Sequence, residues 1–264
     1  DEDFTTLQNA FVALKDGILG NVVLEVAEAQ HQSTHILNRF PGTENYNLTI
    51  QPTSDATPFI ISGSSSATAF QINGVENLTI DGMDKITFQN NATGPFVSID
   101  HDWPGGTNEV CKNLVIKNCT MIGQAGGIIA SAVTNLVVEN VAFQGKATTN
   151  ENSYQGIKFG SGTYDVSDIY IRNNSFTIGS EFESSIGAMQ AIVATGSVTG
   201  DISVVNNVID LSPAISSHLY GIYITPSADD VEVLHNTVHF GGTNGGSDLN
   251  TEGIRLPSSS NDAI

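Results

Sequence analysis

The stretch Asn113-Leu-Val-Ile-Lys-Asn118 decides the fold, because related phrases recur along most of the chain. Later copies read Asn135-Leu-Val-Val-Glu-Asn140, Asp168-Ile-Tyr-Ile-Arg-Asn173, Asp201-Ile-Ser-Val-Val-Asn206 and Asp230-Val-Glu-Val-Leu-His235, and weaker ones begin at Asn47 and Asn77. Successive copies start 22 to 36 residues apart. Short β-branched runs repeated about every thirty residues, with no helix in each unit, are typical of a stacked β-solenoid.

Each unit contains two further short strands. The second strand opens with glycine or alanine, as in Gly127-Ile-Ile-Ala130, Gly156-Ile-Lys-Phe159 and Gly221-Ile-Tyr-Ile224. The third follows the repeated asparagine and contributes Met121, Phe143, Phe176, Ile209 and Val238. Alternation along these strands places Ile and Leu inside and the variable residue outside. The sequence therefore predicts one all-β domain over residues 1–264, a parallel β-helix of about seven coils.

Five residues that end the repeated phrase occupy equivalent turns: Asn118, Asn140, Asn173, Asn206 and His235. Asparagine tolerates the left-handed backbone conformation of a tight turn. Stacked amide side chains can also pass hydrogen bonds from coil to coil. We therefore interpret these residues as a structural ladder rather than as catalytic groups.

The two ends of the chain differ from the repeats. Residues 1–20 predict a capping helix over the open end of the first coil, with Asp3 as the N-cap and Gly17 as the stop. Its apolar face comprises Phe4, Leu7, Ala10, Phe11 and Leu14. At the other end the pattern stops at Ile264, partway through a turn, which indicates a fragment of a longer protein.

Composition limits the partners. The net charge of −19 results from 28 acidic and 9 basic residues, which disfavours nucleic acid and anionic membranes because both require clustered Lys and Arg. No apolar run approaches the ~20 residues of a membrane span. The acidic balance is compatible with neutral glycans and with Ca²⁺, for which Asp100 and Asp102 are the candidate ligands.

Cys111 and Cys119 could form a disulfide only if the chain folded back, and the sequence leaves their pairing open.

Four long insertions fall at equivalent corners of successive coils, at residues 144–155, 179–190, 210–220 and 241–252. Loops on a rigid scaffold often carry binding residues, and these would stack into a wall beside the second strands. The candidate ligand-binding residues are Tyr154, Lys158, His218, Tyr220, Tyr223, Glu252 and Arg255. Carboxylates with Tyr and His suit sugar binding; the alternative is an ordinary solvated wall.

The same loops allow an enzyme as a second hypothesis. Glu181 or Glu183 with Asp210 is the best candidate carboxylate pair. An inverting glycosidase needs two carboxylates about 6.5–9.5 Å apart, a spacing that side chains one or two coils apart can reach. A lyase would need clustered cations, whereas Lys158 and Arg255 are three coils, or about 14 Å, apart.

The coils resemble right-handed parallel β-helix proteins of the pectin-lyase-like superfamily. The phrases Ile-Asp81-Gly82, Ile-Arg-Asn173-Asn174-Ser-Phe176 and Leu-His235-Asn236-Thr-Val238 carry this resemblance. The opening, with Phe4-Thr-Thr-Leu7, Gly20-Asn-Val-Val23 and Leu48-Thr-Ile50, looks like large secreted surface proteins of Bacteroidota. That resemblance implies export by the type IX secretion route. The superfamily includes polysaccharide lyases, glycoside hydrolases and adhesins, so the motifs specify the fold rather than the chemistry.

From these observations we predict a non-enzymatic extracellular or cell-surface segment that acts as an adhesin or rigid spacer and contacts glycans. The alternatives are a polysaccharide-degrading enzyme, either a hydrolase or a lyase, and a cargo segment of a secretion assembly. The first alternative depends on the loop carboxylates. We expect no membrane insertion, and no cofactor other than Ca²⁺.

Overall fold

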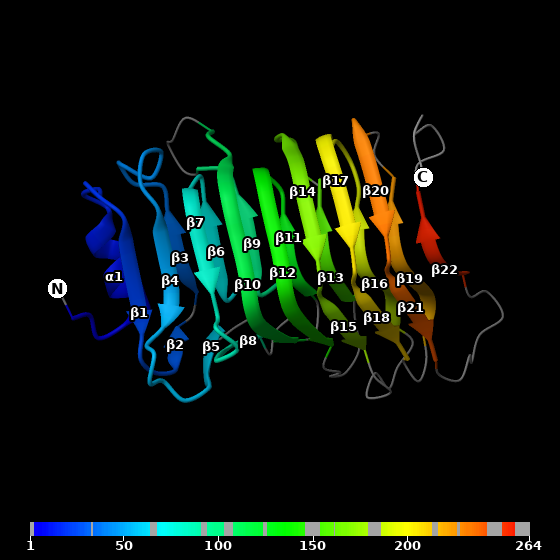
Figure 1. The fold of residues 1–264 in the computed structure, drawn as a ribbon, viewed down its shortest axis with the longest axis horizontal. Helices are drawn as coiled ribbons and strands as arrows, with labels where there is room; N and C mark the ends of the chain where they lie inside the picture. Colours follow the sequence, from blue (N-terminus) through cyan, green and yellow to red (C-terminus); the bar gives the residue numbers. More distant parts are fainter. Residues whose placement is uncertain are drawn as a thin grey trace.

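The computed structural model describes residues 3–32, 34–63, 68–90, 94–102, 108–123, 126–145, 154–160, 162–178, 186–212, 216–225, 228–241 and 250–256. Its strands form a 14-stranded and an 8-stranded sheet. Strands pair in parallel with their equivalents one coil further along, for example β10 with β12 and β13 with β16. The chain therefore winds as an elongated parallel β-solenoid, from α1 at one end to β22 at the other (Figure 1). This confirms the predicted fold class.

Three rows of strands run along the solenoid. The first row comprises β1 (Val22–Val26), β4 (Leu48–Pro52), β7 (Glu76–Asp81), β10 (Cys111–Gly123), β12 (Val133–Gly145), β14 (Val166–Arg172), β17 (Thr199–Val205) and β20 (Asp230–Leu234). The second row is the 8-stranded sheet, with β3 (His35–Asn38), β6 (Phe70–Asn73), β9 (Val97–Asp100), β11 (Gly126–Ala130), β13 (Tyr154–Phe159), β16 (Ile186–Ala194), β19 (Ser216–Ile224) and β22 (Asn250–Arg255). The third row contains β2 (Gln30–Gln32), β5 (Phe59–Gly63), β8 (Ile86–Asn90), β15 (Ser175–Ile178), β18 (Val208–Leu211) and β21 (Thr237–Phe240). Strands β10 and β12 continue from the first row into the third.

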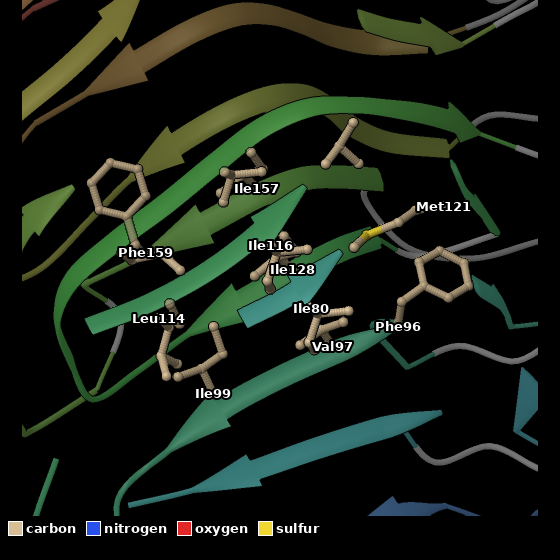
Figure 2. Packing of buried hydrophobic residues seen from close by; sticks show 14 of the residues in the cluster. Ile80, Phe96, Val97, Ile99, Leu114, Ile116, Met121, Ile128, Ile157 and Phe159 are labelled. Carbon is tan, nitrogen blue, oxygen red and sulfur yellow. The ribbon is translucent and has the colours of Figure 1, made fainter. Parts of the chain in front are cut away.

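The core is a stack of equivalent layers. Leu114 lies in register with Leu78 and Leu136, and Ile128 lies in register with Val97 and Ile157. The side chains of these rows fill the space between the sheets (Figure 2) and are almost fully buried. Because successive coils are about 4.8 Å apart, each branched side chain packs directly on the one below it.

A column of large side chains explains Gly127 and Gly156, which lie inside the second-row strands β11 and β13 rather than at their starts as the repeat pattern suggested. Phe143 and Phe176 stack with ring centroids 4.6 Å apart and ring planes 3° apart. A Cβ atom on Gly156 would lie 2.7 Å from the Phe176 ring and 2.6 Å from the carbonyl oxygen of Ala191. Gly127 faces the Phe143 ring in the same way. The glycines therefore make room for the aromatic column against the backbone.

A buried asparagine ladder joins the last coils. Asn174 and Asn207 are 2 % and 0 % exposed. The Oδ1 atom of Asn207 accepts hydrogen bonds from the backbone N and the Nδ2 of Asn174, both at 3.0 Å. Its Nδ2 donates to the carbonyl oxygen of Ile171 at 3.0 Å and to Oδ1 of Asn236 at 2.9 Å. In the preceding coil the position equivalent to Asn174 holds Val141, whose backbone N–H donates to Asn174 Oδ1.

The predicted ladder residues lie one position earlier and face solvent. Asn118, Asn140, Asn173, Asn206 and His235 all have positive φ, from 52° to 62°. Asn140 Nδ2 donates to Asn118 Oδ1, and Asn206 Nδ2 donates to Asn173 Oδ1, each at 3.2 Å. Their main role is thus to turn the backbone. In the last three coils the following residue is also an asparagine, at positions 174, 207 and 236, and it carries the buried bonds.

Helix α1 (Leu7–Leu14) covers one end of the solenoid, which confirms the predicted cap. Leu7, Ala10, Phe11 and Leu14 are buried, and Phe11 packs edge-to-face on Phe70 with ring centroids 5.6 Å apart. Gln8 completes the edge of β3, because its Oε1 accepts from Ile36 N at 2.7 Å and its Nε2 donates to Ile36 O at 3.2 Å. A side-chain amide thus takes the place of a neighbouring strand.

Two details of the helix prediction were wrong. The N-cap is Thr6, not Asp3, because Thr6 has an extended backbone and its Oγ1 accepts a hydrogen bond from Asn9 N at 3.1 Å. Phe4 precedes the helix and is 40 % exposed, so it does not belong to the buried face.

In the described part of the chain, no helix combines the length and the apolar character that crossing a membrane requires.

Replacing Asn207 with Ala should lower the free energy of unfolding by about 2–4 kcal/mol, because the backbone N–H of Asn174 and the carbonyl oxygen of Ile171 lose their hydrogen-bond partner. The matched control is Asn206→Gly. It keeps the positive φ at this position and removes one exposed hydrogen bond, so it should cost less than about 1 kcal/mol. Urea unfolding measures both, and equal losses would contradict the buried ladder.

Replacing Gly156 with Ala should destabilise the protein by about 1–3 kcal/mol through overpacking against the Phe176 ring. Gly20→Ala is the control, since a Cβ there meets nothing within 4 Å. It should change stability by less than about 0.5 kcal/mol. If thermal unfolding shows no difference between the variants, the steric explanation of the second-strand glycines fails.

Candidate functional site

The structure brings together five of the predicted ligand-binding residues on the outward face of β19 and β22. We call His218, Tyr220, Tyr223, Glu252 and Arg255 the tyrosine patch. The pairing register skips Gly221, so the strand bends there, and Tyr220 and Tyr223 both face outward although they are three residues apart. Tyr220 pairs with Glu252 and Tyr223 with Arg255 on the neighbouring strand.

The patch is held by ring and charge contacts. The rings of Tyr220 and Tyr223 meet edge-to-face, with centroids 4.9 Å apart and an interplanar angle of 62°. The Arg255 guanidinium lies over the Tyr223 ring at 5.2 Å and its Nη1 donates to Glu252 Oε1 at 3.3 Å. The His218 ring lies 6.2 Å from that of Tyr220. These contacts fix the rings and cancel the local charge.

Part of the patch is withdrawn from solvent. The Oε2 atom of Glu252 is buried and accepts no hydrogen bond from the described residues. Val193 pairs with Tyr223 on the outward face of the sheet, yet it is only 1 % exposed. A buried carboxylate oxygen without a donor is costly unless something supplies one. The Glu252 side chain as a whole is still 33 % exposed, so rotation of its carboxylate would present Oε2 to a hydroxyl or amide group that binds beside the tyrosines.

Two other predicted ligand residues lie outside the patch. Lys158 stands in the same outward row, in the order Lys158, Val193, Tyr223 and Arg255, so three strand steps separate the two cations. Tyr154 is fully buried, so its assignment to an outward binding wall was wrong. It begins strand β13 in register with the buried Met189 and Leu219, and burial raises the pKa of its hydroxyl.

The candidate catalytic carboxylates are only partly described. Glu181 and Glu183 lie outside the described residues. Asp210 projects from β18, on a different row from the tyrosine patch, and its Oδ1 accepts a hydrogen bond from Ser212 Oγ at 2.6 Å and lies 3.1 Å from His239 Nδ1. The hydrogen bond from Ser212, and then that with His239, lower the pKa of Asp210. The carboxylate stays ionised near neutral pH, which suits an acceptor and not a proton donor.

The same cluster lacks the order of a nucleophilic triad. Such a triad needs a histidine between the hydroxyl and the carboxylate, whereas here Asp210 lies between Ser212 and His239. Both cysteines are free and buried. Burial raises the pKa of the Cys111 thiol to about 12 and also raises that of Cys119, so neither thiol is an activated nucleophile.

The carboxylate of Asp100, one of the two candidate calcium ligands, already has a partner. Asp100 Oδ1 lies 2.7 Å from Nδ1 of His101, whose ring stacks on Tyr164 at 3.8 Å. The backbone N of Asp102 donates to the carbonyl oxygen of Glu109 at 3.0 Å. Within the described ranges, no group of three or more His, Cys, Asp or Glu side chains is arranged to hold a metal ion.

The outward row contains further polar residues that the sequence reasoning missed. Gln155 and Gln190 stand in register with Tyr220 and Glu252, and Gln155 Nε2 donates to Gln190 Oε1 at 2.7 Å. The signal was present, because each of these four residues immediately precedes the small residue that opens a second strand. The row extends the tyrosine patch along the solenoid with amide donors and acceptors.

Comparisons with known proteins add little to this geometry. No protein-family model matches the chain, and no curated protein matches it. A search of solved structures finds the crystal structure of PfbA, a surface adhesin of Streptococcus pneumoniae, at 10 % identity and a TM-score of 0.29, covering 92 % of this chain and 89 % of that chain. A TM-score this low carries no argument about function. The fold assignment rests on the strand pairing of the chain itself.

Proposed function

We propose that this chain is a non-enzymatic binding segment whose tyrosine patch contacts a neutral glycan. The observation that carries the proposal is the pairing of two outward tyrosine rings with Glu252, whose buried Oε2 has no donor among the described residues. Aromatic faces provide an apolar surface for sugar rings. The carboxylate accepts hydrogen bonds from sugar hydroxyls.

The charge of the patch favours a neutral ligand. Arg255 is already paired with Glu252 and lies over Tyr223, so its positive charge is balanced within the patch. The chain as a whole carries a net charge of −19, which repels polyanions. A neutral oligosaccharide running across the strands would meet Tyr220 and Tyr223 and then Gln190 and Gln155 along the same face.

The proposal places the chain at the cell surface or outside the cell, as an adhesin or a rigid spacer. Two features support this location. The chain is acidic, with Asp and Glu outnumbering Lys and Arg by 28 to 9. The parallel coils make a stiff rod, and loops or strand faces on such a rod present ligands at a fixed distance.

Substituting Tyr220 or Tyr223 with Ala should weaken glycan binding about ten-fold or more, as loss of a central aromatic contact does. The measurement is an array of neutral and acidic oligosaccharides, probed with and without a chelator and followed by titration of each hit. Tyr170→Ala is the control, because Tyr170 lies on the outward face of β14 in the other sheet. It should leave binding unchanged.

Three results would contradict the proposal. Equal weakening by Tyr170→Ala would show that the patch is not the site. A preference for uronates or sulfated sugars would overturn the neutral ligand. Release of shortened products from a bound glycan, abolished by Asp210→Asn, would establish an enzyme instead.

A titration of Asp210 followed by carboxyl NMR should give a pKa below the ordinary aspartate range, and Ser212→Ala should raise it, because the hydroxyl donates to the carboxylate. A lowered folded-state pKa stabilises the protein above the unfolded pKa, and this contribution disappears as the pH falls through the folded pKa. A pKa raised toward neutrality would instead mark a carboxyl group suited to proton donation.

A further inference from the structure

Helix α1 and strand β1 lie at the opposite end of the solenoid from β19 and β22, which carry the tyrosine patch (Figure 1). A groove of about 660 Å³ lies at the α1 end. It runs between residues 3–7 and strand β1. Its apolar lining includes Leu7, Ala10 and Leu24, and the half-exposed Phe4 stands at its side. Leu24 packs against the core but is only partly buried, so α1 leaves the first layer incomplete at this point.

Strand β1 presents a free edge to this groove. In the described part of the chain, β1 pairs with β4 alone. Val22 N donates to Asn47 O, and Thr53 N donates to Val26 O, so the even-numbered residues of β1 bond to β4. Alternate residues of a parallel strand point their backbone groups to opposite sides. The N–H and C=O groups of Val23 and Glu25 therefore point into the groove.

Strands β1, β2 and β3 each have one neighbour at this end of the described chain, and the edges of β3 and β1 differ in how their backbone groups are satisfied. Gln8 satisfies the edge of β3, donating to Ile36 O and accepting from Ile36 N. No corresponding side-chain bond to the backbone of Val23 or Glu25 is present among the described residues. An open edge with an apolar floor is the geometry that accepts an extended peptide as an added strand.

The charge of the groove identifies the occupant. Asp3, Glu25 and Glu28 line it, and none of its lining residues is Lys or Arg. Glu25 and Glu28 are exposed, and the one bond to their carboxylates among the described residues is a long one to Glu25, from Gln51 Nε2 at 3.4 Å. A second copy of this chain would bring another net charge of −19 to the contact, which disfavours self-pairing. A positively charged segment is the complementary partner.

We propose that this groove binds an extended, lysine- or arginine-containing segment of a partner protein as a strand added to β1. The backbone of the segment bonds to Val23 and Glu25. Its inward apolar side chains cover Leu24, while its outward cations face Glu25 and Glu28. This interaction is independent of the proposed glycan contact, because the groove and the tyrosine patch lie at opposite ends of the solenoid.

The test uses the chain with three labelled peptides followed by fluorescence anisotropy. The first is Lys-Val-Lys-Val-Lys-Val, the second is its Glu-for-Lys counterpart, and the third is the basic peptide N-methylated at alternate residues on the face that would bond to β1. Only the first should bind, because the second has the wrong charge and the third cannot donate to the strand edge. Bound peptide should slow amide exchange at Val23 and Glu25, as measured by NMR.

Variants separate charge from backbone pairing. Glu25→Gln with Glu28→Gln should weaken binding of the basic peptide about two- to five-fold per carboxylate, and the effect should shrink in high salt. The matched control, Asp229→Asn with Glu232→Gln, removes two charges beside β20 and should have no effect. Val23→Pro removes an edge N–H without touching β4, a substitution that edge strands tolerate. It should reduce binding while circular dichroism shows an intact fold.

The proposal is overturned by any of four results. These are no binding of the basic peptide at millimolar concentration, equal binding of the acidic or methylated peptide, protection confined to residues away from β1, and a concentration-dependent dimer that competes with the peptide. The last result would make a second copy of the chain the occupant.

Discussion

Parallel, in-register pairing of equivalent strands is the constraint on which the whole structure depends. It holds successive coils about 4.8 Å apart, so every residue of the repeat stacks on its equivalent in the next coil. Apolar positions then become continuous rows such as Leu78, Leu114 and Leu136. Outward positions become rows too, which is why Tyr220 meets Glu252 on the neighbouring strand.

Stacking makes each residue depend on its equivalents in the adjacent coils. The Phe176 ring fits only because the opposing residue is Gly156, and the buried amide of Asn207 is favourable only because asparagines flank it. Charged rows behave in the same way, since Lys117 pairs with Asp81 of the preceding coil at 3.1 Å. Burial alone would raise the pKa of Asp81, but hydrogen bonds from Asn118, Met83 and Lys117 together lower it.

The ends of a solenoid are where this constraint is broken. Every interior strand has two neighbours, while β1, β2 and β3, at the α1 end, have one each in the described chain. Helix α1 buries Phe11 against Phe70 and supplies Gln8 to the edge of β3. It does not reach the edge of β1, where the acidic groove remains. The solenoid thus offers two surfaces of different chemistry: a half-buried aromatic face and a strand edge with negative charge.

The repeat pattern is enough to predict the solenoid and most of the tyrosine patch, because alternation separates inside from outside and the repeat sets the register. The capping helix is predictable from the helical spacing of apolar residues within residues 1–20. The burial of Tyr154 was not predictable in this way, because strand β13 begins at that residue and packs it in the row of Met189. The sequence also did not show that Asn206 is exposed while Asn207 is buried. Both residues are asparagine, and only the direction of the backbone turn decides which side chain points inward. Burial, hydrogen bonding and charge pairing arise between coils, so a single repeat does not encode them and the folded chain decides them.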